Sequence, residues 1–359
     1  MTGDAADVGD AELEGARARR LPQARPGQFT FVMATGIVST ALHNTGAHGL
    51  SDVLLVLAVT GYVVLAALVG VRWATERSAP RDDLHTGTFT VFAFTAASGV
   101  LAARFAAMAI DGAAITLTAI AAVTWFVLGY VVIGVVVRDN GTRGLSRVDG
   151  TWFLVVVATQ SVAVSSGALA DAGHREGFAV LAAICWSVGL VQLILIAALM
   201  AARLLTVPLR VDDEVAPFWV FMGAGAISVL AGAEILGAAA DQTLLDDEVV
   251  ASVSTALWAF ATWLIPLLIA LTVWHARRPG AVTGFRTALW SMVFPIGMYG
   301  EASHQLGVFR SRPWLESLGA WESWVALSVW AVVFVGMLVW WTRWLGRRRG
   351  GGVRVAADR

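Results

Sequence analysis

Long apolar segments separated by short polar stretches follow one another along most of the chain. Ten such segments lie at residues 28–43, 52–74, 87–109, 112–137, 151–170, 176–205, 216–239, 249–275, 285–308 and 320–345. An α-helix crosses about 30 Å of hydrocarbon with roughly 20 apolar residues. The pattern therefore predicts an all-α integral membrane protein with about ten transmembrane helices.

The ten segments are of two kinds, which alternate along the chain. Odd-numbered segments are rich in Gly, Ala, Ser and Thr, as in "FVMATGIVST", "FAFTAASGVLAARF" and "FMGAGAISVLAGAEIL", whereas even-numbered ones are continuously apolar, as in "LLVLAVTGYVVLAALVG". Small residues allow helices to approach closely and to form hydrogen bonds, and bulky apolar residues suit contact with lipid. We expect five helical hairpins around a central pore, with odd helices inside and even helices outside. Close packing without a pore is the alternative explanation of the small residues.

Composition supports a membrane protein, because 57% of the 359 residues are hydrophobic and only 14% are charged. A soluble protein carries nearer a quarter charged residues. The net charge of -1 gives no indication of a nucleic-acid partner. The single cysteine, Cys185, excludes a disulfide within the chain and favours no thiolate metal site.

Arginine placement predicts the orientation. If both termini are cytosolic, 21 of the 25 arginines lie on the cytosolic side of the ten segments, as the positive-inside rule expects. We therefore expect a multi-pass protein of the cell membrane. We predict that residues 1–25 form a disordered cytosolic tail, that residues 26–346 form the transmembrane domain, and that residues 347–359 form a basic cytosolic tail.

The ninth segment, "ALWSMVFPIGMYGEASHQLG", carries a proline and several polar residues within its apolar span. Phe294, Met298, Glu301 and Gln305 follow the spacing i, i+4, i+7, i+11 and therefore share one helix face. Glu301 is expected about 10 Å further out than Phe294, which lies near mid-membrane. Pro295 predicts a break whose freed carbonyls are buried in protein or face water. A lumen beside the break is one explanation, and a kink tolerated for packing is the other.

Ionisable groups on the inner segments fall at a common level. Arg104, Glu234, Glu301 and His304 lie in the outer halves of the third, seventh and ninth segments. Such groups within a membrane usually face a cavity or each other. We expect them to form an outer vestibule for an anion, and a structural ion pair between Arg104 and either glutamate is the alternative.

Hydrogen-bond donors for an anion are also available on the inner segments. Besides Arg104 and His304, the candidates are the pore-lining hydroxyls of Thr35, Ser39, Thr95, Ser98, Ser165 and Ser228 and the backbone amides around Gly223 and Gly297. Glu301 or Glu234 is a candidate proton acceptor, which would couple anion movement to protons.

Three segments resemble one family of membrane proteins. "FPIGMYGEASHQLG", "WFLVVVATQSVAV" and "PFWVFMGAGAISVLAGA" are similar to segments of the tellurite-resistance/dicarboxylate transporter family, which includes bacterial tellurite-resistance permeases, fungal malate and sulfite transporters and plant slow anion channels. The resemblance runs over nearly all of residues 26–345. It implies a quasi-fivefold pore, a homotrimer with one pore per subunit, and Phe294 before Pro295 as the side chain that closes the pore.

The polar groups of the inner segments and the resemblance together predict transport of small anions, and the resemblance implies C4-dicarboxylates such as malate or a related oxyanion of the tellurite or sulfite type. Glu234 and Glu301, together with the lack of mid-span prolines in the other inner segments, favour a proton-coupled carrier, and a passive anion channel is the alternative. An intramembrane enzyme is a remote alternative, because no HExxH motif or paired catalytic groups occur. Only His304 of the six histidines lies clearly inside a segment, so no haem or other cofactor is expected.

Overall fold

The computed structural model describes residues 23–139, 144–173, 176–211, 213–237, 244–279 and 284–351, with side chains except at residues 139 and 347–351. Within these residues the chain forms α-helices and short 3-10 helices and contains no β-strand. Most of the predicted N-terminal tail, residues 1–22, lies outside this description. So does the predicted C-terminal tail from residue 352 onward.

Ten long helices correspond to the ten predicted segments. Five of them are largely buried: α2 (Thr30–Asn44), α5 (Phe92–Ala107), α7 (Leu154–Asp171), α9 (Trp219–Gly237) and α11 (Trp290–Phe309). Each is followed by a longer, more exposed helix: α3 (His48–Thr75), α6 (Asp111–Asp139), α8 (Glu176–Thr206), α10 (Asp247–Ala276) and α12 (Pro313–Gly351). The sequence did not predict the short, polar helix α4 (Ala79–Thr86), which follows α3.

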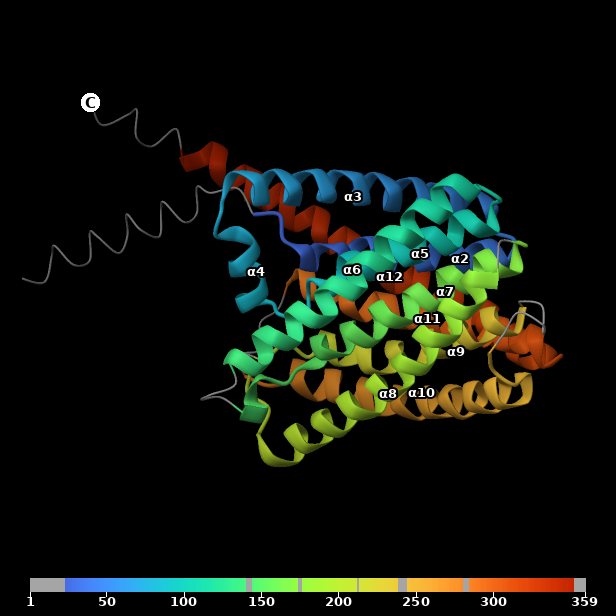
Figure 1. Cartoon of the computed structure of the whole chain (residues 1–359). Helices are drawn as coiled ribbons and strands as arrows, with labels where there is room; N and C mark the ends of the chain where they lie inside the picture. Colours follow the sequence, from blue (N-terminus) through green and yellow to red (C-terminus); the bar gives the residue numbers. More distant parts are fainter. Residues whose placement is uncertain are drawn as a thin grey trace, which may run out of the picture.

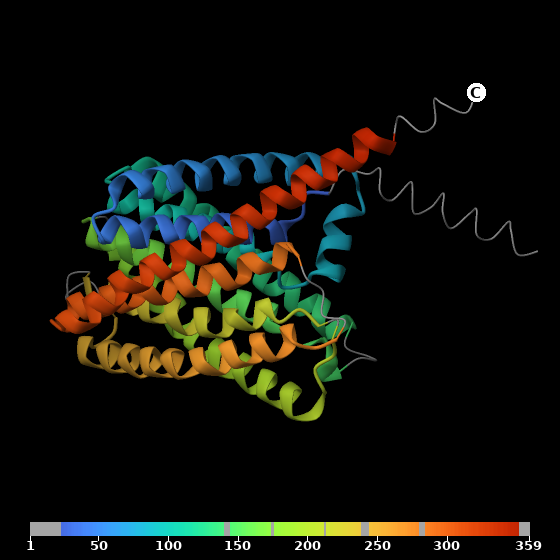
Figure 2. The same ribbon diagram turned by 180° about the vertical axis from the view of Figure 1, so that it is seen from behind.

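The five buried helices form a closed ring. In it α2 contacts α5, α5 contacts α7, α7 contacts α9, α9 contacts α11, and α11 returns to α2. Each ring helix also packs along the helix that follows it, and both views show the helices running roughly along one direction, with α12 oblique to the others (Figures 1 and 2). In the most apolar stretch of each helix, the buried share is 89% for the segment that contains α7 but only 11% for α6. Inner and outer helices are therefore clearly distinct.

Glycine allows the ring helices to approach closely. A Cβ atom on Gly99 of α5 would lie 2.7 Å from the carbonyl oxygen of Ser161 on α7. A Cβ on Gly297 of α11 would lie 3.1 Å from a methyl carbon of Ile37 on α2. Close packing therefore accounts for part of the small-residue content of these helices.

Polar contacts tie each ring helix to the outer helix that precedes it around the ring. In each case an aromatic side chain of the outer helix contacts a hydroxyl or carbonyl group of the ring helix. The pairs are Trp330 Nε1 to Thr35 Oγ1 at 3.0 Å, Tyr62 OH with Ser98 Oγ at 2.8 Å, Trp125 Nε1 to Thr159 Oγ1 at 2.8 Å, Trp186 Nε1 to the Ser228 carbonyl at 2.9 Å, and Trp258 Nε1 to Ser303 Oγ at 2.9 Å. One such contact per ring helix repeats the same arrangement five times.

Among the described residues, seven helices are long and apolar enough to cross a membrane: α3, α6, α7, α8, α9, α10 and α12. The ring helix α5 is apolar but shorter, and α2 has only 15 residues. Short, polar-containing helices are tolerated in the ring because the outer helices separate them from lipid. The chain is thus a multi-pass helical membrane protein.

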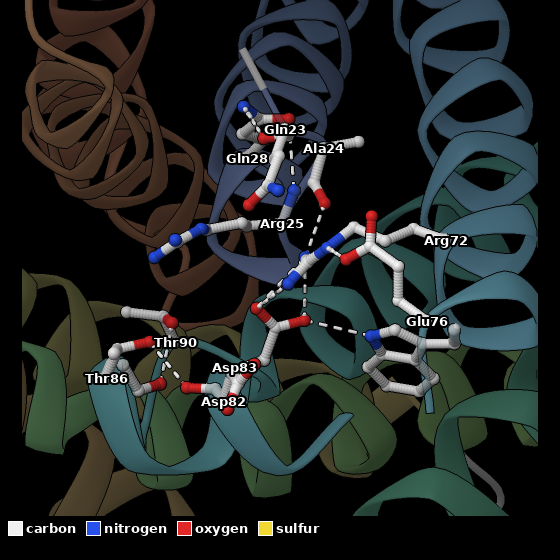
Figure 3. Close-up of polar contacts among 12 residues, drawn as sticks. Gln23, Ala24, Arg25, Gln28, Arg72, Glu76, Asp82, Asp83, Thr86 and Thr90 are labelled. Atoms are coloured by element: carbon white, nitrogen blue, oxygen red, sulfur yellow. Dashed lines mark hydrogen bonds and ion pairs between the residues drawn. The ribbon is translucent and has the colours of Figure 1, made fainter. Parts of the chain in front are cut away.

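The two ends of the bundle differ. The end that carries α4 and the end of α12 is called the terminal side (Figure 1), and the opposite end the distal side. On the terminal side Arg72 of α3 donates to both carboxylate oxygens of Asp83 on α4 at 3.1 Å and to the Ala24 carbonyl at 2.8 Å (Figure 3). Arg72 and Asp83 are only 8% and 4% exposed, so this buried ion pair fixes α4 and the segment before α2 to α3.

Candidate functional site: two cavities within the ring

Two cavities lie within the ring, one toward each side. The distal cavity has a volume of about 390 Å³ and is lined by residues of all five ring helices. Its charged residues are Arg104, Asp171, Glu234 and Glu301. The proximal cavity, on the terminal side, has a volume of about 240 Å³ and is lined by the first turns of ring helices and by the segments before them.

A short stretch of each ring helix separates the two cavities. In three helices the last residue lining the proximal cavity and the first lining the distal cavity are seven positions apart, about 10 Å along the axis. These pairs are Thr30 and Ile37, Leu154 and Ser161, and Ser291 and Met298. Each ring helix has one residue that lies three positions before its first distal-cavity residue. In the order α2, α5, α7, α9 and α11, these residues are Ala34, Ala97, Ala158, Ala224 and Pro295. All four alanines are 0% exposed, so the ring is tightly closed at this level.

Phe294 lies between the cavities. It follows Ser291 by three positions and precedes Met298 by four, so the three residues share one helix face. Ser291 lines the proximal cavity, Met298 lines the distal one, and Phe294 is 1% exposed and lines neither. Four positions before the first distal-cavity residue, the other four ring helices carry Met33, Ala96, Val157 and Gly223, so at this position α11 carries an aromatic ring where they carry smaller or aliphatic side chains.

Helix α11 runs through Pro295 as one α-helix from Trp290 to Phe309, so the predicted break is limited to the hydrogen bond that Pro295 cannot donate to the carbonyl four positions earlier. The proline ring is accommodated beside Gly223 of α9, where a Cβ atom would lie 2.8 Å from Pro295 Cγ. Gly223 and Gly297 both lie inside continuous helices, at contacts between neighbouring ring helices. They therefore serve close approach, and the expectation of amides freed for an anion was wrong.

Arg104 lines the distal cavity without a carboxylate partner. Its side chain is 2% exposed, and Nη2 donates to Ser51 Oγ at 3.2 Å. Nε is buried without a hydrogen-bond partner. Within the described residues no carboxylate oxygen lies within 4.0 Å of the guanidinium. The structure therefore does not contain the ion pair to Glu234 or Glu301 that was the alternative explanation of Arg104.

Glu301 is held in place by two amide groups. Its Oε1 accepts from Asn44 Nδ2 at 2.7 Å and from Gln305 Nε2 at 2.8 Å, while Oε2 is buried without a partner. Asn44 was missed in the sequence, although a polar residue ends the first inner segment at the level of Glu301. All three residues line the distal cavity, so this cluster presents both amide donors and a carboxylate.

His304 does not line the distal cavity, contrary to the expectation from sequence. Its backbone packs against α12, where a Cβ atom on Gly319 would lie 2.6 Å from the His304 nitrogen. The reason is helical geometry, because Gln305, four positions after Glu301, shares its face more closely than His304 does. The structure brings Arg104, Glu234, Glu301, Met298 and Gln305 together and leaves His304 outside.

The six candidate hydroxyls also lie away from both cavities. All are 0% exposed, namely Thr35, Ser39, Thr95, Ser98, Ser165 and Ser228. Five of them donate to a carbonyl of their own or a neighbouring helix. Thr95 pairs with Thr124 on α6 at 2.9 Å. A hydroxyl has one proton to donate, and in these groups it is already used within the protein. The side-chain donors that line the distal cavity and have a hydrogen left to donate belong to Arg104, Asn44 and Gln305.

Comparison with known proteins agrees with this architecture. Two uncharacterized membrane proteins, from two strains of Mycobacterium tuberculosis, are each 45% identical to the chain over 144 residues, which is 40% of this chain and 73% of each relative. The family model described as voltage-dependent anion channel matches residues 23–338. This match confirms the resemblance found in the sequence, since that family includes the tellurite-resistance and slow anion channel proteins. The chain belongs to the voltage-dependent anion channel family.

Proposed function

We propose that this protein moves small anions across the cell membrane along the axis of the ring. The observation that carries the proposal is the pair of cavities on opposite sides of one closed level, with Phe294 between them. In this proposal all ten long helices span the bilayer as five hairpins. The terminal side faces the cytosol, as the arginine distribution favours.

Phe294 is the gate in this proposal. Apolar constrictions close a pore by steric block and by excluding water. Ala34, Ala97, Ala158 and Ala224 stand one register position after that of Phe294 and are 0% exposed, so neither cavity passes this level while the Phe294 ring is in place. Rotation of the Phe294 ring away from the axis would join the two cavities without a large movement of helices.

Arg104 is the central anion ligand in this proposal. It has an unpartnered Nε and no ion pair among the described residues, so a bound anion would satisfy a buried cation. Asn44 and Gln305 each have a second amide hydrogen, because the hydrogen bond to Glu301 uses only one.

Three carboxyl groups and one guanidinium line the distal cavity, which favours coupling to protons. Charged Asp171, Glu234 and Glu301 together would repel an anion in a medium of low dielectric constant. Protonation of Glu301 or Glu234 lowers that repulsion, so we propose proton-coupled movement of malate or a related oxyanion. A passive channel is the second candidate, favoured by family membership. Assembly as a homotrimer is also proposed, on the resemblance alone.

Flux measurements on purified protein in proteoliposomes test the function. Malate, sulfite, tellurite and chloride are offered one at a time, with and without an inward proton gradient. Proton-coupled carriage predicts accumulation of one of the oxyanions only with the gradient, whereas a passive channel gives equal flux with and without it. Absence of flux for all four anions, in protein that is folded and correctly inserted, would contradict the proposed function.

A further inference from the structure

An apolar groove lies on the outside of the ring, between the outer helices α3 and α6. Its volume is about 430 Å³. Ala66, Gly70 and Trp73 of α3 form one wall, and Val123 and Val127 of α6 are part of the other. Thr124 is the single polar residue among those lining it, and its hydroxyl donates to the Ile120 carbonyl at 2.7 Å.

The groove opens toward the hydrocarbon of the bilayer. Both α3 and α6 are long and apolar enough to span a membrane, and only 22% and 11% of their most apolar stretches are buried. Val123 and Val127 are 62% and 52% exposed beside the groove. Such surfaces contact lipid, so the groove is a recess in the lipid-facing surface.

We propose that this groove binds one acyl chain of a phospholipid from the leaflet on the terminal side. It extends from Ala66 to Trp73, seven positions or about 10 Å along α3. A recess of this length and volume, lined almost entirely by apolar side chains, accommodates a flexible alkyl chain.

The ends of the two walls suit a phospholipid headgroup. Exposed Arg77 follows the end of α3, and exposed Arg138 lies in the last turn of α6, both on the terminal side. Arginine binds phosphate by charge-assisted hydrogen bonds. Arg77 stands four positions after Trp73, so a lipid with its chain in the groove would have this cationic group beyond the terminal-side end of the α3 wall.

The floor of the groove connects it to the closed level of the ring. Phe29 and Phe94 line the floor with ring centroids 5.0 Å apart, and Tyr62 stacks on Phe94 at 5.6 Å. Tyr62 in turn contacts Ser98, the neighbour of Ala97. The acyl chain therefore supports the ring from behind at the level of Phe294, whichever anion the protein carries.

Photo-crosslinking tests the proposal. The protein is reconstituted with phosphatidylglycerol and phosphatidylethanolamine, including a trace of lipid with a diazirine in its acyl chain, and labelled residues are mapped by mass spectrometry. We expect labelling concentrated on the groove residues of α3 and α6. Gly70→Phe fills the groove, since nothing lies within 4 Å of a Cβ there, and should abolish that labelling. Gly134→Phe on exposed α6, with equally open space, should leave it unchanged.

Two results would overturn the proposal. Labelling spread over the exposed faces of α3 and α6, and unaffected by Gly70→Phe, would mean ordinary surrounding lipid only. Disulfide formation between copies through Val127→Cys would mean that a second copy covers the groove. If Gly70→Phe does not fold, Gly70→Leu serves as the smaller filling variant, and its labelling decides the question in the same way.

Discussion

Replacing Arg104 separates a role in anion binding from a role in holding the fold. Arg104→Met keeps an unbranched apolar stem and removes the charge and all hydrogen-bond donors. Each hydrogen bond between a charged group and a ligand contributes about 1.5–3 kcal/mol, so losing one should weaken anion binding roughly 10- to 150-fold. Binding is measured by titration calorimetry with the oxyanion that is most effective in the flux assay.

Stability should respond differently, because Arg104 has no ion pair in the described residues. The variant loses the contact to Ser51 at 3.2 Å but no longer buries an unpaired charge. Replacing buried charge by apolar side chains is often neutral or stabilising, so we expect an unchanged or higher melting temperature. The same protein preparation is used for calorimetry and thermal unfolding.

Arg72→Met is the matched control, since Arg72 is a buried arginine that does have a carboxylate partner. Breaking its ion pair with Asp83 leaves an uncompensated carboxylate and should cost about 3–5 kcal/mol of unfolding free energy. Anion affinity should stay at the wild-type value. If Arg104→Met instead lowers the melting temperature as much as Arg72→Met does, and anion affinity is unchanged, Arg104 is structural and our assignment is refuted.

Two further substitutions probe the same ring. Glu301→Gln keeps the shape of the side chain but cannot exchange a proton, so pH-driven accumulation should be lost while exchange of anion down its gradient persists; full pH-driven uptake would move the coupling role to Glu234. Gly223→Ala should destabilise the contact of α9 with α11 by about 1–3 kcal/mol, because its Cβ would lie 2.8 Å from Pro295 Cγ. Gly225→Ala, with its Cβ 3.6 Å from Ala261, should be tolerated in the same thermal unfolding experiment.

The helical pattern predicted most of the fold. Alternation of small-residue and bulky apolar segments distinguished buried α7 from exposed α6, since a helix surrounded by helices and a helix facing lipid need different side chains. Helix α4 was missed because its stability depends on Asp83 meeting Arg72 of α3, a contact that local sequence does not reveal. The ends of α12 were also misjudged, because helices continue beyond the apolar span that a hydropathy pattern detects.

The site was predicted less completely than the fold. The helical spacing predicted that Met298, Glu301 and Gln305 share one helix face, and all three line the distal cavity. The roles of Thr35 and Ser98 could not be inferred, because a small polar residue in an inner helix suits a pore and a contact to an outer helix equally well. Their partners, Trp330 and Tyr62, lie on other helices.

Removal of the Phe294 side chain tests the central claim most directly. Single-channel or vesicle flux recordings compare Phe294→Ala with Phe221→Ala, which removes a ring from α9 that lines neither cavity and stacks on Phe153 at 4.4 Å. If Phe294 closes the path between the cavities, Phe294→Ala should raise anion flux well above wild type and Phe221→Ala should not. Unchanged or lower flux through correctly folded Phe294→Ala protein would contradict the account.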